Sequence, residues 1–390
     1  MSTKGWLLSI GAGQHQQSVL IEARALGYQT LAVDINPDAF ARSLADAFIC
    51  HSAWDAKGIL ARLPESIRPH IKGVVTQAAR GCTVTTAQLG KWLGVPHLNP
   101  SVADFFLDKQ RALKRFNTTR TYTFASIDKI PESMGVPFVI KQLSTSGGLG
   151  NYLVHSRQDL EHFRHLKGEF VVEPFIVGRH FGLVGISDGV HVKFYGAVER
   201  RLRTNMTLDH AFFPADLDDA QAKVIRFANR VLQESGFNLG PFQLEFILQS
   251  DSQCHFIELE PSVLGSYISE WMIPTAGAGN MIEDSIRVAT GEPIDFNSST
   301  PQGIAFSKYY YPEDPYISQQ QGRHKAFKQY GDGDLIDIDS RQYVGNALIY
   351  ADTLQQAEYT LTQLESSTDT SNSVANHEYR GRNIAWDPAG

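Results

Sequence analysis

Short apolar runs alternate with amphipathic stretches over the first hundred residues of this chain. The runs at 6–10 and 30–34 predict strands, and the stretch at 17–26 between them predicts a helix. A further strand is expected at 72–76. Strand–helix–strand order favours a parallel sheet with helical crossovers. We therefore expect a parallel α/β domain over residues 1–98.

The pattern changes after residue 98. Ser101 is suited to cap a helix, which we expect to continue through Phe116. Another helix is expected from Asp216 to Ser235, and the basic segment 199–205 is expected to lie between ordered elements. Apolar segments with strand character, the later ones predicted to form an antiparallel sheet, lie at 137–141, 152–154, 170–178, 181–186 and 192–198.

Two further segments, 242–248 and 254–259, predict strands joined by a turn. Glu245 and Glu258 interrupt them, and a buried carboxylate is costly unless a positive group meets it. Glu258 and Glu260 are two positions apart, so on a strand they share one face, and Glu245 joins them if the strands pair. Three carboxylates on one face suit Mg²⁺, with Mn²⁺ as an alternative ion, rather than zinc. A solvated hairpin face is the competing interpretation.

Length, net charge and cysteine content limit the classes of protein to which this chain can belong. The 390 residues suffice for two or three domains, and a formal net charge of -7 disfavours a nucleic-acid partner. No apolar run approaches the roughly 20 residues that a membrane span needs. Cys50, Cys82 and Cys254 lack metal or redox spacing and are expected to be reduced thiols. We expect a cytoplasmic protein without a membrane partner.

Two glycine-rich segments suggest phosphate chemistry. Gly11 and Gly13, with Asp34 at a strand end, form half of a dinucleotide fingerprint, but Gln16 stands where the third glycine belongs. The loop 144–150 joins two strands instead of opening a helix, which argues against Rossmann and Walker arrangements. Its backbone N–H groups suit phosphates, although a mobile hairpin tip is an equal alternative.

Taken in order, these segments resemble the ATP-grasp superfamily of carboxylate–amine ligases. That superfamily includes L-amino acid ligases, carbamoyl-phosphate-synthase-like enzymes and biotin-carboxylase-like enzymes. The resemblance covers nearly the whole chain and rests on Lys109, on Lys141 before the glycine loop, on segment 173–178, on Glu245 and on segment 258–261. Segments 307–315 and 343–349 resemble the carboxylase-like C-terminal portion.

The resemblance implies an ATP-grasp fold of mixed α/β and α+β class. Residues 1–98 would form the parallel pre-ATP-grasp domain. Residues 99–205 would form the central part, with the glycine-rich lid and the adenine hinge. Residues 206–390 would form a C-terminal antiparallel lobe with the metal site and a carboxylase-like subdomain.

The resemblance also implies a set of site residues. Lysines, lid residues and hinge residues would contact ATP: Lys109, Lys141, Ser146, Gly147, Gly148, Glu173, Phe175, Ile176 and His180. The residues that would hold Mg²⁺ are Glu245, Glu258 and Glu260. The wall of the substrate pocket would include Ser262, Gly265 and Ser266.

Two positions depart from the family pattern. His180 stands where the family often has a ribose-binding Glu, and Ser262 stands where it often has an Arg that stabilises developing negative charge. Candidates for that missing charge are Arg200, Arg201, Arg203 and Arg287. His210 is a candidate amine-side general base, with an ordinary loop histidine as the alternative.

The implied activity is ATP-dependent amide or peptide bond formation through an acyl phosphate. Small-molecule carboxylate and amine substrates are expected, with an amino acid or a small carboxylic acid favoured, and the resemblance suggests a homodimer. A bicarbonate- or formate-using carboxylase or purine-pathway-like enzyme is the first alternative. An NAD(P)-dependent oxidoreductase and a nucleotide-binding module without catalysis are the others.

Overall fold

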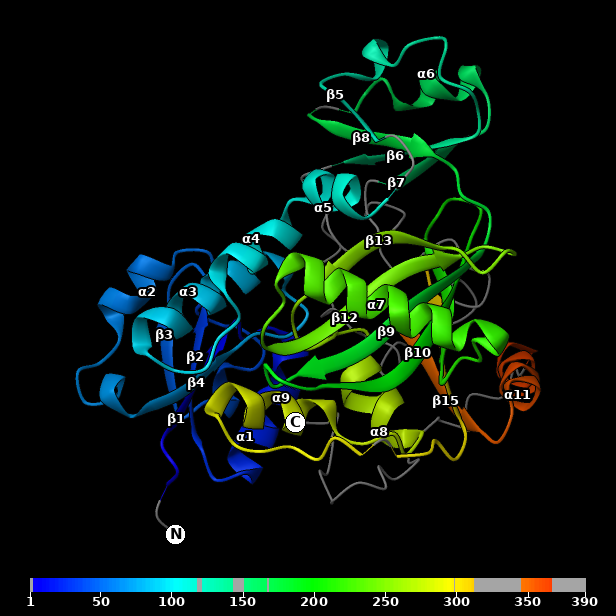
Figure 1. Cartoon of the computed structure of the whole chain (residues 1–390). Helices are drawn as coiled ribbons and strands as arrows, with labels where there is room; N and C mark the ends of the chain where they lie inside the picture. Colours follow the sequence, from blue (N-terminus) through cyan, green and yellow to red (C-terminus); the bar gives the residue numbers. More distant parts are fainter. Residues whose placement is uncertain are drawn as a thin grey trace.

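Three sheets organise the protein in a computed structural model (Figure 1). A parallel sheet near the N-terminus and a large antiparallel sheet form the body, and a small sheet stands apart as a separate lobe. No helix among the residues described is long and apolar enough to cross a membrane. The structure describes residues 3–117, 121–142, 151–166, 168–297, 299–311 and 345–366.

The N-terminal sheet has the strand order β3-β2-β1-β4, and all its pairings are parallel. This confirms the parallel α/β arrangement predicted from the apolar runs. The elements are β1 Trp6–Ile10, α1 Gln17–Ala25, β2 Gln29–Asp34, β3 Ala47–Cys50, α2 Ala56–Arg62, β4 Ile71–Val75 and α3 Thr83–Leu93. In such sheets ligands bind beyond the carboxyl ends of the strands, so the loops there matter for the site.

The helix predicted from Ser101 through Phe116 is in fact two helices. Asn99, not Ser101, caps the first, because its side chain accepts a hydrogen bond from the Ser101 N–H. Asp108 caps the second and accepts from the Arg111 N–H. The chain therefore turns at Asp108 and starts a new helix with Lys109. The elements are α4 Pro100–Leu107 and α5 Lys109–Phe116.

The small lobe is an antiparallel sheet of order β5-β8-β6-β7. Strands β6 and β7 pair as the hairpin expected on either side of the glycine loop. Phe138, Ile140, Phe170 and Val172 are fully buried and form its core. The elements are β5 Tyr122–Phe124, β6 Phe138–Gln142, β7 Asn151–Val154, α6 Leu160–Phe163 and β8 Phe170–Pro174.

The large sheet has seven antiparallel strands in the order β13-β12-β9-β10-β11-β14-β15. Strand β10 continues to Leu202, so most of the basic segment 199–205 lies within the sheet and not between elements. The strands are β9 Arg179–Ser187, β10 Val192–Leu202, β11 Leu208–Phe213, β12 Gly240–Leu248, β13 Cys254–Glu260, β14 Ile304–Tyr310 and β15 Gly345–Ala351.

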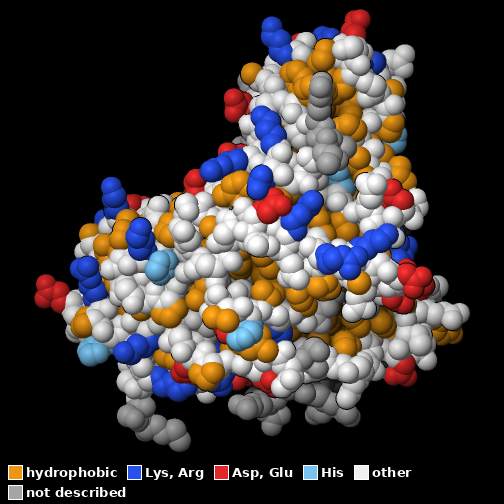
Figure 2. All heavy atoms as spheres, viewed as in Figure 1, with side chains coloured by type: hydrophobic (Ala, Val, Ile, Leu, Met, Phe, Trp, Pro, Cys, Tyr) orange, Lys and Arg blue, Asp and Glu red, His pale blue; other side chains and the backbone are white. Residues whose placement is uncertain are grey.

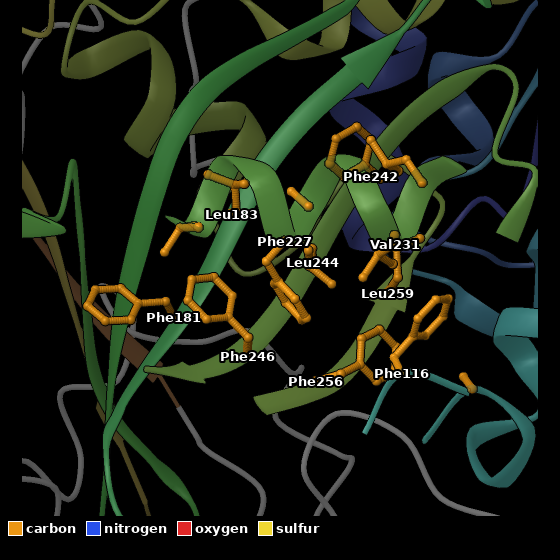
Figure 3. Packing of buried hydrophobic residues seen from close by; sticks show 14 of the residues in the cluster. Phe116, Phe181, Leu183, Phe227, Val231, Phe242, Leu244, Phe246, Phe256 and Leu259 are labelled. Atoms are coloured by element: carbon orange, nitrogen blue, oxygen red, sulfur yellow. The ribbon is translucent and has the colours of Figure 1, made fainter. Parts of the chain in front are cut away.

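Helix α7, Gln221–Ser235, covers one face of this sheet (Figure 3). Phe227 and Val231 of the helix pack against Phe181, Leu244 and Phe246 of the strands. Each fully buried side chain of this size contributes about 1.5–3 kcal/mol relative to exposure. Because strand side chains alternate, the residues between these positions face the other side of the sheet.

That other side carries a second core and three short elements. A π-helix at Ile268–Met272 leads directly into α8, Ile273–Thr275, and α9 is Met281–Thr290. Helix α11, Leu354–Ser366, follows β15 and packs against it. Helix α9 also covers the N-terminal sheet, because Ile282 and Ile286 share one buried cluster with Leu7 and Val75. It thereby joins the N-terminal sheet to the seven-stranded sheet.

Candidate active site

The carboxylates lie on the face of the large sheet opposite α7. Strands β12 and β13 pair so that Glu245 is directly across from Glu258, and Gln243 is across from Glu260. On β9, Gly182 lies opposite Glu245 and contributes no side chain. The Gln243 side chain fills the space above this glycine, since a Cβ there would lie 2.3 Å from its Nε2. The sheet thus presents two facing glutamates beside the Gln243 amide.

Two arginines neutralise the facing glutamates. Arg200 of β10 forms an ion pair with Glu245. Arg80, from the loop after β4, donates to Glu258 over 2.7 Å and to the Phe106 carbonyl over 2.7 Å. A buried carboxylate needs such a partner, so the arrangement explains how two acidic side chains persist within an apolar sheet.

The three carboxylates differ in their proton affinity. Burial raises the pKa of Glu245 despite Arg200. Burial also favours the neutral form of Glu258, but Arg80 and Lys109 outweigh it and lower the pKa of that carboxyl. Burial, with repulsion from Glu258, raises the pKa of Glu260 to about 7. Burial lowers the pKa of Lys109, and the charge of Glu258 opposes that shift.

The expected three-carboxylate metal site is not assembled as such. Within the part of the chain that the structure describes, no group of three or more His, Cys, Asp or Glu side chains is arranged to hold a metal ion. Glu260 instead accepts from the Ser262 hydroxyl over 2.8 Å. Glu245 and Glu258 still fit Mg²⁺, which commonly takes one or two carboxylates together with substrate phosphates.

The small lobe supplies a second pair of charges. Lys141 of β6 and Glu173 of β8 form a buried ion pair. The Glu173 Oε2 atom is buried and has no hydrogen-bond partner among the described residues, so it can accept from a donor such as an adenine amino group. The Phe175 N–H already donates to the Pro137 carbonyl, which leaves its carbonyl and the Ile176 backbone for a hinge contact. Ser146, Gly147 and Gly148 lie outside the described residues.

His180 belongs to the same face as the glutamates. It lies on β9 directly across from Arg200. Its Nε2 is shielded from solvent and has no partner within the described chain. Burial, with the charges of Arg200 and Lys141, lowers the pKa of His180 to about 3. A neutral imidazole with an unused nitrogen fits a hydrogen bond to a hydroxyl group.

Other candidate residues lie elsewhere. Strand alternation puts Arg201 and its partner across the ladder, His210, on the face opposite Arg200. Arg201 pairs there with Glu199, and His210 stacks on Phe306.

Arg203 pairs with Asp209 over 3.2 Å and lies over the Tyr311 ring. Arg287 pairs with Glu283 and Glu292 on and beside α9, in a group that includes Lys4. Of the arginine candidates, Arg200 is the one that the structure pairs with a predicted metal ligand.

The predicted substrate wall follows β13. Ser262 is buried beside Glu260. A Cβ on Gly265 would lie only 2.5 Å from the Cβ of Ala78, so only glycine permits this close approach of the two loops. The Ser266 carbonyl accepts from the Tyr309 hydroxyl over 3.3 Å.

Sequence reasoning missed Arg80. Its one signal is its place shortly after β4, at the carboxyl edge of the parallel sheet where ligands bind in open α/β folds. The contact with Glu258 crosses 178 positions of sequence, which local pattern does not reveal.

Asp34 has a structural use in this chain. One carboxylate oxygen accepts from the Ala12 N–H and the other from the Asn36 N–H, each over 2.9 Å. The carboxylate thus holds the glycine turn after β1 in place. This occupies the group that an NAD(P) site would need for the ribose.

We compared the sequence and the fold with those of known proteins. No family model matches the chain. Formate-dependent phosphoribosylglycinamide formyltransferase from Bacteroides thetaiotaomicron is 23% identical over 305 residues, covering 74% of this chain and 78% of that protein.

Two solved structures match nearly the whole fold. A crystal structure of N5-carboxyaminoimidazole synthetase from Staphylococcus aureus complexed with ADP has a TM-score of 0.73 at 19% identity, covering 94% of this chain and 98% of that one. L-amino acid ligase from Bacillus licheniformis has a TM-score of 0.73 at 16% identity, with the same coverage.

The parallel N-terminal sheet, the small lobe and the seven-stranded sheet together form the ATP-grasp fold. In sequence and in fold the chain is similar to ATP-grasp carboxylate–amine ligases, which form C–N bonds with release of ADP. This confirms the fold class and bears out the resemblance inferred from the order of the motifs.

Proposed function

We propose that this protein is an ATP-dependent ligase that activates a small carboxylic acid as an acyl phosphate and joins it to an amine. The observation that carries the proposal is the Glu245–Glu258 pair, set across two neighbouring strands and flanked by Arg200 and Arg80. Carboxylates and cations placed together in this way suit a reaction in which phosphate charge must be balanced.

The reaction has two steps. A carboxylate oxygen of the acid attacks the γ-phosphorus of ATP, and the bond to ADP breaks. The nitrogen of the amine then attacks the acyl carbon, and phosphate leaves with the electron pair of the C–O bond. Neither step needs a protein nucleophile, so positioning and charge stabilisation suffice.

The residues divide this work by location. Glu173 and His180 have buried acceptor or donor atoms without partners among the described residues, and these would bind the base and the ribose of ATP. Lys109 and Lys141 would contact its phosphates. Glu245 and Glu258 would hold Mg²⁺, which when bound neutralises phosphate charge.

The arginines would balance the negative charge of the substrate carboxylate and of the transferred phosphoryl group. Arg200, which pairs with Glu245, would meet the substrate carboxylate or the transferred phosphoryl group. Arg80 would perform the same role from the N-terminal side. These two would replace the arginine that the family often carries where this chain has Ser262.

A second candidate uses a one-carbon acid and an amine carried on a sugar phosphate. It is favoured by the relatives, because a formate-dependent phosphoribosylglycinamide formyltransferase and an N5-carboxyaminoimidazole ribonucleotide synthase both match. The L-amino acid ligase match, at 16% identity, rests on the fold alone and gives an amino acid substrate less support. The acid therefore has to be found by experiment.

The test is ADP and phosphate release from Mg-ATP, with mass detection of products. Purified full-length protein is incubated with single amino acids, pairs of amino acids, formate with glycinamide ribonucleotide, and bicarbonate with aminoimidazole ribonucleotide. A product lighter by one water than an acid and an amine together identifies the reaction. Absence of ADP release with every combination would contradict the proposal.

Glu258→Gln is the diagnostic variant. It keeps the shape of the side chain but removes the charge beside Arg80, and we expect turnover to fall by about 100-fold or more. Glu234→Gln is the control, because Glu234 lies on α7 and pairs with the exposed Arg115. Equal activity of the two variants would remove the role assigned to Glu258.

A further inference from the structure

One amide beside the glutamates has a hydrogen-bond donor that the described chain does not use. Gln243 of β12 is 5% exposed, and its Nε2 atom is shielded from solvent. Among the residues described, nothing accepts a hydrogen bond from this atom. A buried donor without an acceptor is costly, and the exceptions in native proteins often have a catalytic role or bind a further group. The amide therefore needs an acceptor from outside the described chain.

Strand alternation places this amide on the face of the sheet that carries the glutamates. Phe242 and Leu244, its neighbours along β12, pack on the opposite face against α7 (Figure 3). The end of the Gln243 side chain lies over Gly182 of β9, because a Cβ on that glycine would collide with the amide. Gly182 in turn lies across from Glu245. The amide is therefore directed along the sheet toward Glu245.

The register of the sheet sets the order of these side chains along β12. His180 of β9 lies across from Ile247, and Glu245 is two residues before Ile247. Gln243 is two residues earlier again, and each such step is about 7 Å. The charge of Lys141 acts on His180, so the His180 end lies toward the small lobe. On the face shown in Figure 2, Lys and Arg side chains gather where this lobe meets the body, which suits the approach of a polyanionic nucleotide.

This order predicts where each reactant lies. With the ribose of ATP at His180, its γ-phosphate would lie at Glu245 and Glu258, the residues proposed to hold Mg²⁺. The attacking oxygen approaches the γ-phosphorus in line, from the side opposite the bond to ADP. The carboxylate of the acid would then lie beyond the glutamates, at the position of Gln243.

We propose that Gln243 binds the acid substrate, with its Nε2–H donating to the carboxylate oxygen that does not attack ATP. This rests on the proposed ligase activity and adds a residue for the acid to that site. A neutral donor orients this oxygen without adding to the charges of Arg200 and Arg80.

The same donor serves both steps of the reaction. In the first step, the other carboxylate oxygen forms a bond to the γ-phosphorus and the bond to ADP breaks. In the second step, the amine nitrogen bonds to the acyl carbon, and the π pair of the C=O bond moves onto the oxygen that Gln243 holds. The pair returns as the C–O bond to phosphate breaks, and the amine proton leaves with the phosphate. A donor fixed at the acyl oxygen stabilises the charge that develops there.

Gln243→Met tests this role, because methionine has a similar length and lacks the donor. Gln233→Met is the matched control, since Gln233 is exposed on α7. Wild type and both variants are compared by urea denaturation. They are also compared by the kinetics of ADP release, with the acid and amine that give a product.

We expect Gln243→Met to lower kcat/KM for the acid by about 10- to 100-fold, while KM for ATP stays within about twofold of wild type. Its urea midpoint should equal or exceed that of wild type, because the amide has no partner to lose among the described residues. A glutamine with a purely structural role would give the opposite pattern. Gln233→Met should match wild type in both measurements.

Gly182→Ala is a second variant, and it leaves Gln243 itself intact. Its added Cβ would displace the amide, so kcat/KM for the acid should fall while KM for ATP is retained. In the double variant with Gln243→Met, the two effects should not multiply, because both act on one contact.

Two results would overturn the inference in different ways. Unchanged kcat/KM for the acid in both Gln243→Met and Gly182→Ala would show that the amide does not touch the acid. Absence of ADP release from wild type with every acid and amine would contradict the ligase activity itself, and the role of Gln243 would fall with it.

Discussion

At the level of single residues, this site depends on side chains whose charge is set by burial. Glu245 and Glu258 lie in an apolar sheet and are tolerated because Arg200 and Arg80 meet them. His180 behaves differently: it has no anionic partner among the described residues, and burial, with the charges of Arg200 and Lys141, lowers its pKa to about 3. Both arrangements hold polar atoms ready for a charged ligand.

The low pKa of His180 makes stability depend on pH. An unfolded histidine titrates near pH 6.5, so between about pH 6.5 and pH 3 the unfolded chain binds a proton that the folded chain does not. Stability from neutral His180 is therefore complete above that range and is lost as the pH falls. Between pH 7 and pH 5 we expect a loss of about 2 kcal/mol in the free energy of unfolding.

Urea denaturation of wild type and His180→Gln at a series of pH values measures this loss. The difference in free energy of unfolding between the two proteins should shift against wild type by that amount as the pH falls. His191→Gln, at an exposed histidine, is the control and should track wild type. A constant difference between wild type and His180→Gln would show that His180 is not held neutral.

Residue-level prediction from sequence succeeded where strand alternation fixes the geometry. The spacing of Glu258 and Glu260 indicated their shared strand, and the apolar surroundings of Glu245 indicated its burial. Alternation also puts Arg200 and Arg201 on opposite sides of the sheet. Which of the two lies on the side of the glutamates depends on the register of β10, and the sequence does not give that register. Arg80 could not be predicted, because its contact depends on how distant loops meet.

At the level of elements, the hinge segment between β8 and β9 lies in close contact with β12, and this contact fixes its position. Gly178 follows β8 and leads into β9, and a Cβ there would lie 2.5 Å from both the Leu248 carbonyl oxygen and the Ile247 side chain. The backbone oxygen cannot move without disturbing the edge of the ladder. The hinge residues Phe175 and Ile176 are therefore held in place by a glycine contact.

We predict that Gly178→Ala lowers the free energy of unfolding by about 1–3 kcal/mol, the usual cost of overpacking, and raises KM for ATP. Gly135→Ala is the matched control, because its added Cβ would meet nothing within 4 Å. Urea denaturation and ATP kinetics on the two variants test this. Equal stability of the two would mean that the hinge segment is free to move away from β12.

Elements were predicted well where period and turn chemistry agreed, as in the hairpins β6–β7 and β12–β13. The helix break at Asp108 was missed because an apolar helical pattern continues across it, while the cap depends on one carboxylate bonding to a backbone amide. The length of β10 was missed because its charged end looks like a loop. Arg200 and Glu199 lie within the strand because ion pairs to Glu245 and Arg179 offset their burial.

At the level of the whole molecule, the contacts of helix α9 bear on whether residues 1–98 form a separate domain. The order of motifs predicted the ATP-grasp architecture and a first domain at residues 1–98. The structure covers one face of that sheet with α9, which lies almost 200 positions further along the chain. A Cβ on Gly73 of β4 would be 2.7 Å from the Ala289 carbonyl, so strand and helix are in tight contact.

This arrangement predicts that residues 1–98 do not fold alone. Without α9, Leu7 and Val75 of the sheet and Val19 of α1 would lose the cover that Ile282 and Ile286 now give them. We expect the isolated fragment to bind a hydrophobic dye and to lack a cooperative urea transition. In the full chain, Ile286→Ala should cost about 2–5 kcal/mol, whereas Val190→Ala, at an exposed position, should cost little. A sigmoidal urea transition of the fragment, with slow amide exchange in β1 and β4, would show that the N-terminal sheet is an independent domain and that α9 merely docks on it.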